Sequence, residues 1–194
     1  MAPKRKVVVI GAVSKRVEWK TGIVGKLTGG VAGLLKNYGA TNVFGAARIV
    51  DKNTVEVTGE DGKQTLKCDD IVIATGSEPI NIPGFTCDEK DVWSSTGALA
   101  PESIPGHLLV IGGGYIGLEL GMMYAKLGSK VTVLEGTPGA LPGQERDCVK
   151  VIERSMKKMG IKLHTETFAQ GFEKKGGKYV VTAKTKKGEE KIEC

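Results

Sequence analysis

The feature that most constrains this chain is a glycine-rich segment, Gly112-Gly113-Gly114-Tyr115-Ile116-Gly117, between a predicted strand and a predicted helix. Residues 108–111 form a short apolar run typical of a buried strand. Residues 116–127 then repeat apolar side chains at helical spacing, and Gly128 follows them. A second strand-like run, 130–134, ends at Glu135. This order predicts a βαβ unit with two parallel strands and a glycine-rich first turn.

The pattern G-x-G-x-x-G by itself is weak, because glycine-rich turns also occur in α/β proteins that bind no nucleotide. Its position after a strand and before a helix favours a dinucleotide. Gly112 would allow the tight turn, Gly114 the close approach of a pyrophosphate, and Gly117 the close packing of helix on strand. The helix N-terminus would offer free N–H groups to the phosphates.

Glu135 stands 18 positions after Gly117, where an acidic residue typically binds the ribose of the adenosine. Its carboxylate would accept hydrogen bonds from the ribose hydroxyls and would repel a 2′-phosphate. No arginine follows it before Arg146. The sequence therefore predicts a preference for NAD over NADP.

The other expected elements give a mixed α/β protein. Residues 13–37 have the spacing of a helix, and we expect it to break near Gly29–Gly30. Residues 144–159 predict a second amphipathic helix. Residues 78–106 carry four of the seven prolines, so this stretch is expected to be an irregular linker. Predicted strands cover residues 6–10, 42–44, 47–50, 54–57, 64–67, 71–74 and 161–165, with a hairpin formed by 168–174 and 179–185.

Composition excludes several classes of function. The net charge is +6, but the lysines are spread out and aromatic residues make up only 5% of the chain, so we expect no nucleic-acid partner. No apolar run is long enough to cross a membrane, so we expect no membrane as a partner. The cysteines and histidines have neither the spacing of metal ligands nor the pattern of a catalytic triad; they are Cys68, Cys87, Cys148, Cys194, His107 and His164. We therefore expect no metal site and no catalytic residue, and the cysteine usage suits a reducing, cytoplasmic location.

Five segments together resemble the dihydrolipoyl dehydrogenases, which are flavin-dependent disulfide oxidoreductases of 2-oxo acid dehydrogenase complexes. They are LTGG-containing residues 26–31, IATGS at 73–77, SSTGAL at 94–99, LVIGGGYIGLEL at 109–120 and KVTVLE at 130–135. The resemblance runs from about Val17 to Cys194. It implies a Rossmann-like FAD/NAD(P)-binding α/β fold, with a parallel sheet and a β-meander.

The resemblance also implies site residues. The NAD pyrophosphate and nicotinamide would be lined by Gly112, Gly113, Gly114, Tyr115, Ile116, Gly117 and Glu119, with Glu135 on the ribose and Thr167 near the adenine. Positions that touch FAD in the family match Gly45, Thr75, Gly76 and Ser77.

The chain also departs from the family pattern. Gly11-Ala12 is followed directly by sequence that lies beyond the family's redox helix, so the FAD glycine loop and the C-x₄-C cysteine pair are missing. The dimerisation domain, with its catalytic His–Glu pair, is not matched either. We expect an internally deleted and C-terminally truncated member with two partial domains. These are a remnant FAD-binding-type domain at 1–77, a linker at 78–106, and an NAD-binding domain at 107–194 lacking its last strand.

The resulting expectation is NAD(H) binding without dihydrolipoamide turnover. FAD is a cofactor of the intact family, and a 2-oxo acid dehydrogenase complex is not expected as a partner without the dimerisation domain. Two alternatives remain open at this point. One is a non-catalytic interaction module, and the other is a truncated chain with no independent activity.

Overall fold

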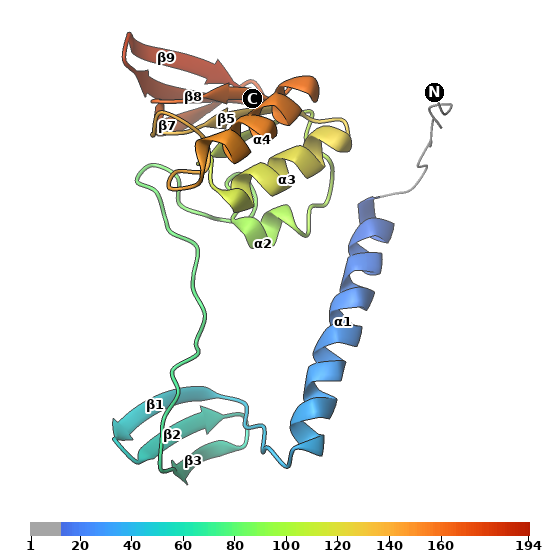
Figure 1. Ribbon diagram of the computed structural model, residues 1–194, viewed down its shortest axis with the longest axis vertical. Coiled ribbons are helices and arrows are strands. Elements are labelled where there is room, and N and C mark those ends of the chain that lie inside the picture. Colours follow the sequence, from blue (N-terminus) through green and yellow to red (C-terminus); the bar gives the residue numbers. More distant parts are fainter. Residues whose placement is uncertain (1–12) are drawn as a thin grey trace. The chain divides into compact units, whose positions relative to one another are not determined.

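The computed structural model describes residues 13–194, and Figure 1 shows their helices and strands. The chain divides into two compact units. Residues 18–78 form the N-terminal unit, and residues 79–194 form the body of the C-terminal unit. The strand predicted at residues 6–10 lies outside the described residues.

A three-stranded parallel sheet forms the centre of the C-terminal unit. Its strands are β4 (His107–Ile111), β5 (Lys130–Leu134) and β6 (Lys162–His164), in the order β4-β5-β6. Helix α3 (Tyr115–Lys126) connects the first two strands, and α4 (Arg146–Lys158) connects the second pair. Parallel strands require such crossovers, so the predicted βαβ unit is confirmed and continues into a second one.

Alternate side chains of β4 and β5 point to opposite faces of the sheet, and each face has its own core. The face with α3 and α4 contains side chains that are at most 2% exposed: Leu118, Tyr124, Val131, Val133, Val149 and Met156. Because such cores are packed closely, these residues fix both helices against the strands.

The opposite face of the sheet packs against an antiparallel meander of β7 (Phe168–Lys175), β8 (Lys178–Thr185) and β9 (Gly188–Glu193). Leu134 meets Val181 and Ala183 there, each at most 3% exposed. The predicted hairpin at Gly176–Gly177 is confirmed, and both glycines have positive φ. The sequence of β9 gave little indication of a strand because Ile192 is its one large apolar residue. This segment is a strand because it pairs with β8.

Residues 79–106 are mostly irregular, as predicted, and contain the short helix α2 (Ser95–Ala98). The Ser94 hydroxyl caps α2 by accepting a hydrogen bond from the N–H of Thr96. The buried Tyr124 hydroxyl of α3 donates to the carbonyl of Ala98 at 2.7 Å. This bond fastens the irregular segment to the helix that follows the glycine loop.

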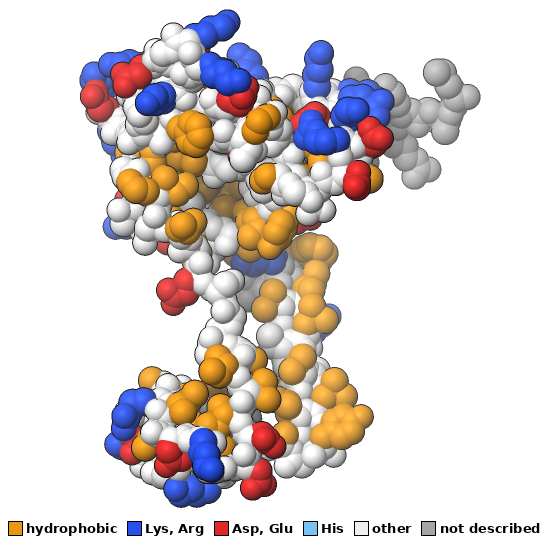
Figure 2. Space-filling view, turned by 60° about the vertical axis from the view of Figure 1, so that its left-hand side comes forward, with side chains coloured by type: hydrophobic (Ala, Val, Ile, Leu, Met, Phe, Trp, Pro, Cys, Tyr) orange, Lys and Arg blue, Asp and Glu red, His pale blue; other side chains and the backbone are white. Residues whose placement is uncertain are grey.

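The N-terminal unit contains most of α1 (Val13–Asn37) and a three-stranded antiparallel sheet. Its strands are β1 (Ala46–Asp51), β2 (Thr54–Gly59) and β3 (Gly62–Lys67), with the predicted hairpin between β2 and β3. Hydrophobic side chains lie at the surface of this unit in Figure 2, and α1 has no buried residue. Trp19 and Leu27, for example, are 72% and 67% exposed.

Three sequence predictions for this unit were wrong. Helix α1 runs without a break through Gly29–Gly30, because a glycine weakens a helix but still supplies its backbone donor and acceptor. Residues 42–44 and 71–74 are not strands, and Val72 and Ile73 are 87% and 73% exposed. A β-branched run becomes a strand when a neighbouring strand pairs with it, and neither segment pairs with a described strand.

The bond between Tyr124 and Ala98 gives a test of this packing. Tyr124→Phe should lower the free energy of unfolding by about 1–2 kcal/mol, because the Ala98 carbonyl loses its buried donor. Urea denaturation followed by circular dichroism measures the change. Tyr38→Phe is the control, since Tyr38 is 87% exposed and should leave the midpoint unchanged. Equal midpoints for the two variants would show that the bond contributes nothing.

Candidate functional site

The glycine loop turns sharply out of β4 into α3. The Gly112 N–H donates to the Leu134 carbonyl at 2.8 Å, so the end of β4 stays attached to β5. Gly112 has φ +103°, a conformation that favours glycine. Gly114 is the N-cap of α3 and brings no side-chain hydrogen bond to the helix end. The N–H groups of the first turn of α3 are therefore available to an anion.

Gly117 and Gly114 are glycines for two different structural reasons. A Cβ on Gly117 would lie 2.6 Å from the Gly112 carbonyl oxygen and 3.0 Å from Cγ1 of Val110, so this glycine lets helix and strand approach closely. A Cβ on Gly114 would have no protein atom within 4 Å. A side chain at Gly114 would thus enter the space beside the helix N-terminus, where a phosphate would bind.

Glu135, which directly follows β5, connects that strand to the glycine loop. Its Oε2 accepts a hydrogen bond from the Gly113 N–H at 2.6 Å, and its Oε1 accepts one from the Thr137 N–H at 2.7 Å. The residue is only 7% exposed. A Cβ on Gly113 would come within 3.0 Å of Oε2. The middle glycine of the loop thus allows the loop to approach the carboxylate closely.

Burial by itself would raise the pKa of Glu135, but the hydrogen bonds it accepts outweigh that effect. The N–H groups of Thr137 and Gly113 favour the charged form, and the pKa of Glu135 lies below its usual value of 4.5. The carboxylate is therefore ionised at neutral pH. The Thr137 side chain and the Gly136 N–H favour the charged form as well, so the protein supplies several donors to this carboxylate.

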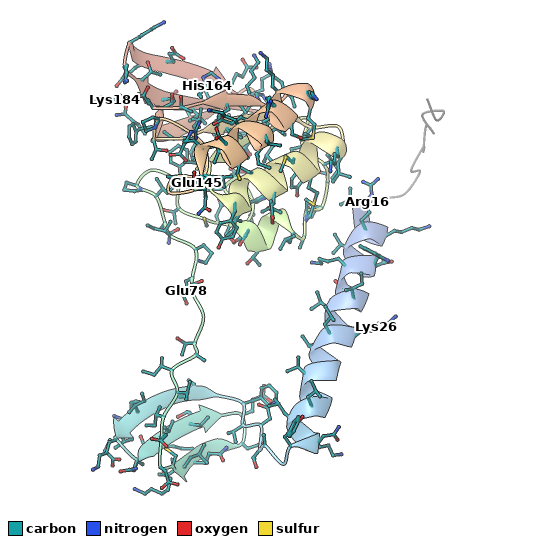
Figure 3. All side chains as sticks on the ribbon, viewed as in Figure 1. Arg16, Lys26, Glu78, Glu145, His164 and Lys184 are labelled. Carbon is teal, nitrogen blue, oxygen red and sulfur yellow. The ribbon has the colours of Figure 1, made fainter. Side chains whose placement is uncertain are left out.

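Thr167 lies next to Glu135, and its predicted place near the adenine stays a prediction. The Thr167 N–H donates to the Glu135 carbonyl at 2.9 Å, and the Glu135 N–H donates to the carbonyl of His164 at 2.8 Å. Figure 3 labels His164 at the end of β6. The Thr167 hydroxyl donates to the Thr165 carbonyl at 2.9 Å, and its residue is 4% exposed. Its position is fixed mainly through the backbone.

Three predicted site residues form an exposed rim at the start of α3. Tyr115 is 69% and Ile116 48% exposed, and Glu119 is exposed one turn further along. The sequence left open whether Glu119 faces solvent or is held in the apolar part of the helix. In the structure it faces solvent.

The residues expected at an FAD site belong to the N-terminal unit. Gly45 has φ +150°, and a Cβ there would lie 2.6 Å from the Thr58 carbonyl oxygen. Packing between backbone segments therefore accounts for this glycine. Thr75, Gly76 and Ser77 lie in a segment without regular structure.

The cysteines form no disulfide in the part of the chain that the structure describes. All four are free thiols, and Cys148 is exposed while the other three are partly buried. Within residues 13–194, no group of three or more His, Cys, Asp or Glu side chains could hold a metal ion.

Sequence reasoning missed a loop that folds onto the site. Residues 137–144 and Arg146 line an open pocket of about 310 Å³, and its lining includes neither Glu135 nor the glycine loop. Within this loop, the Leu141 N–H donates to the Gly113 carbonyl at 2.8 Å, and Leu141 has φ +50°. The glycines and prolines of residues 136–143 indicated an irregular loop, but not the side of the sheet on which it lies.

A family model described as pyridine nucleotide-disulphide oxidoreductase matches residues 2–194. The chain belongs to this family. Dihydrolipoyl dehydrogenase of Bacillus subtilis is 47% identical over 179 residues, and that of Haloferax volcanii is 42% identical over 181 residues. Both alignments cover 92% of this chain and 38% of the relative. The resemblance to dihydrolipoyl dehydrogenases is thus confirmed, for a chain spanning about 38% of their length.

Solved structures confirm the fold expected for the family. LpdA from Mycobacterium tuberculosis matches with a TM-score of 0.84 at 22% identity, over 95% of this chain and 41% of that one. The HOCl-induced flavoprotein disulfide reductase RclA from Escherichia coli matches with a TM-score of 0.78 at 26% identity, over 93% of this chain and 41% of that one. The α/β fold with parallel sheet and meander is therefore that of this family. Across residues 13–194, no helix has the length and apolar character needed to span a membrane.

The charge on Glu135 predicts a pH dependence of stability. A carboxyl with a lowered pKa in the folded state stabilises the fold above its ordinary pKa, and this contribution is lost as the pH falls through the folded value. Glu135→Gln should therefore lower the free energy of unfolding by about 1–3 kcal/mol at neutral pH. It should also reduce the loss of stability that sets in as the pH falls below about 5. Urea midpoints at neutral pH and at a series of acidic pH values measure both effects.

The exposed Glu102 supplies the matched control. Glu102→Gln should retain the acid-induced loss of stability seen in the unaltered chain. If Glu135→Gln followed the same curve as the control, the two backbone bonds to Glu135 would not depend on its charge.

Proposed function

We propose that this chain binds NAD(H) through the glycine loop and Glu135, and that it does not itself turn over dihydrolipoamide. The observation that carries the proposal is the Glu135 carboxylate, held by the Gly113 N–H at 2.6 Å beside an uncapped helix N-terminus. Phosphate and ribose groups have complementary partners at these two places. The relatives named dihydrolipoyl dehydrogenase support the assignment to a nicotinamide dinucleotide.

Each part of the dinucleotide has a corresponding group in this site. The N–H groups at the start of α3 would receive the pyrophosphate, and the open space beside Gly114 lets it approach the backbone. Glu135 would accept hydrogen bonds from the ribose hydroxyls. Tyr115 and Ile116 lie exposed on the same end of the helix, where they could cover the bound molecule. When bound, NAD supplies hydride transfer at its nicotinamide ring.

Charge makes this site selective for NAD. The ionised Glu135 would stand beside the 2′-position, and a phosphate there would meet like charge in a poorly solvated environment. The nearest cation along the following chain, Arg146, is already paired with Glu153 at 3.2 Å. We expect NADPH to bind at least about tenfold more weakly than NADH.

Calorimetric titration with NADH and NADPH tests the proposal. The variant Gly114→Ala tests in addition whether the dinucleotide binds at the glycine loop. A methyl group at Gly114 meets no protein atom, so the variant should fold as well as the unaltered chain while obstructing the phosphate. We expect its affinity for NADH to fall about tenfold or more. Gly106→Ala is the matched control, because its methyl group also meets no protein atom within 4 Å and it lies before β4. Failure of the folded, unaltered chain to bind NADH would refute the proposed function.

The absence of turnover is proposed from the cysteines. Disulfide reduction requires a thiol pair, and Cys68, Cys87, Cys148 and Cys194 are free and match none of the family's redox positions. At the expected flavin positions, Gly45 is accounted for by backbone packing and residues 75–77 lack regular structure, so no flavin step is proposed. We expect no NADH formation from dihydrolipoamide and NAD above a blank without protein. The intact Bacillus subtilis relative serves as the positive control, and rates above the blank would contradict this part of the proposal.

A further inference from the structure

We propose that Arg146 is a positioning residue, which holds the 137–144 loop against the glycine loop and so prepares the dinucleotide site. The inference rests on the proposed function, because the arrangement matters for binding only if that site binds NAD(H). Its physical basis is a chain of contacts that runs from Arg146 through Gly139, Ala140 and Leu141 to Gly113.

The last link of this chain fixes the glycine loop. The Gly113 N–H donates to Glu135 at 2.6 Å, and the Gly113 carbonyl accepts from the Leu141 N–H at 2.8 Å. These two groups belong to the two peptide units on either side of the Gly113 Cα. Both backbone torsions of a glycine, which is otherwise free to adopt many conformations, are therefore held. One of these two hydrogen bonds, that from the Leu141 N–H, comes from the 137–144 loop.

Arg146 contacts the middle of that loop. Its Nη1 donates to the Ala140 carbonyl at 3.4 Å, and its Nη2 pairs with Glu153 at 3.2 Å. A Cβ on Gly139 would lie 3.0 Å from the guanidinium carbon and would overlap Nη1. The planar guanidinium thus packs directly against the Gly139 backbone. On the same residue, the Gly139 carbonyl accepts a hydrogen bond from the Thr137 hydroxyl at 2.8 Å.

The ion pair with Glu153 cannot explain a large effect of Arg146 on stability. The Arg146 side chain is 53% exposed and that of Glu153 is 27% exposed, and such surface pairs contribute little. The contribution of Arg146 is therefore to the geometry of residues 139–141. Without the guanidinium, the Ala140 carbonyl loses its partner and the Leu141 N–H is held less firmly at Gly113.

Paired substitutions test this coupling. Gly139→Ala should push the guanidinium away, and Arg146→Ala should remove it, so each should raise the Kd for NADH about fivefold. In the double variant the methyl group has nothing to displace, so its Kd should equal that of Arg146→Ala alone. The controls are Gly106→Ala and Arg154→Ala, the latter an exposed arginine of the same helix bonded to the Lys150 carbonyl. A double variant weaker by the product of the two single effects would overturn the coupling.

Hydrogen exchange of the Leu141 amide, measured without ligand, separates positioning from direct contact between Arg146 and the dinucleotide. We expect this amide to exchange about fivefold faster in Arg146→Ala than in the unaltered chain or in Arg154→Ala. Unchanged exchange would overturn the proposal, whatever the binding data show. If the unaltered chain binds no NADH, the proposed function fails, while the exchange measurement still decides whether Arg146 holds the loop.

Discussion

The site depends on one buried carboxylate. Glu135 directly follows β5, and its two oxygens bond the N–H groups of Gly113 and Thr137, which lie on opposite sides of it in sequence. An ionised group that is 7% exposed is stable only with such partners. The same two bonds therefore keep the charge in place, fix the glycine loop after β4, and start the loop that leads to α4.

Much of the C-terminal unit could be predicted from sequence, because its signals are local. The apolar runs before Gly112 and Glu135 gave both central strands, and the 3.6-residue spacing gave α3 and α4. Each motif glycine had a distinct expected role; the φ value of Gly112 fits a tight turn and the Cβ environment of Gly117 fits close packing, while the role of Gly114 stays a prediction. Glu135 could be found by its distance from the motif. The hydrogen bond between Glu135 and Gly113 could not be predicted, because it joins residues at the ends of two different strands.

What sequence reasoning missed depends on distant partners. Residues 71–74 have the composition of a strand, yet a strand needs a neighbour and none of the described strands pairs with them. Conversely, β9 has the composition of a solvated segment and becomes a strand by pairing with β8. The glycines and prolines of the 137–144 loop predict turns, so the sequence indicates only a connection there. They do not predict which backbone group accepts the hydrogen bond of the Leu141 N–H.

The two units differ in how much of their own structure they bury, and this bears on where binding can occur. The C-terminal unit has a core on each face of its parallel sheet, so the ends of β4 and β5 are fixed from both sides. In the N-terminal unit, the buried residues of the sheet are Thr54 and Val57, and α1 has none. A binding site requires groups held within fractions of an ångström by rigid elements. That requirement is met around Glu135 and Gly113, where two strands, a helix end and a fastened loop converge, and it is the physical reason to place function in the C-terminal unit.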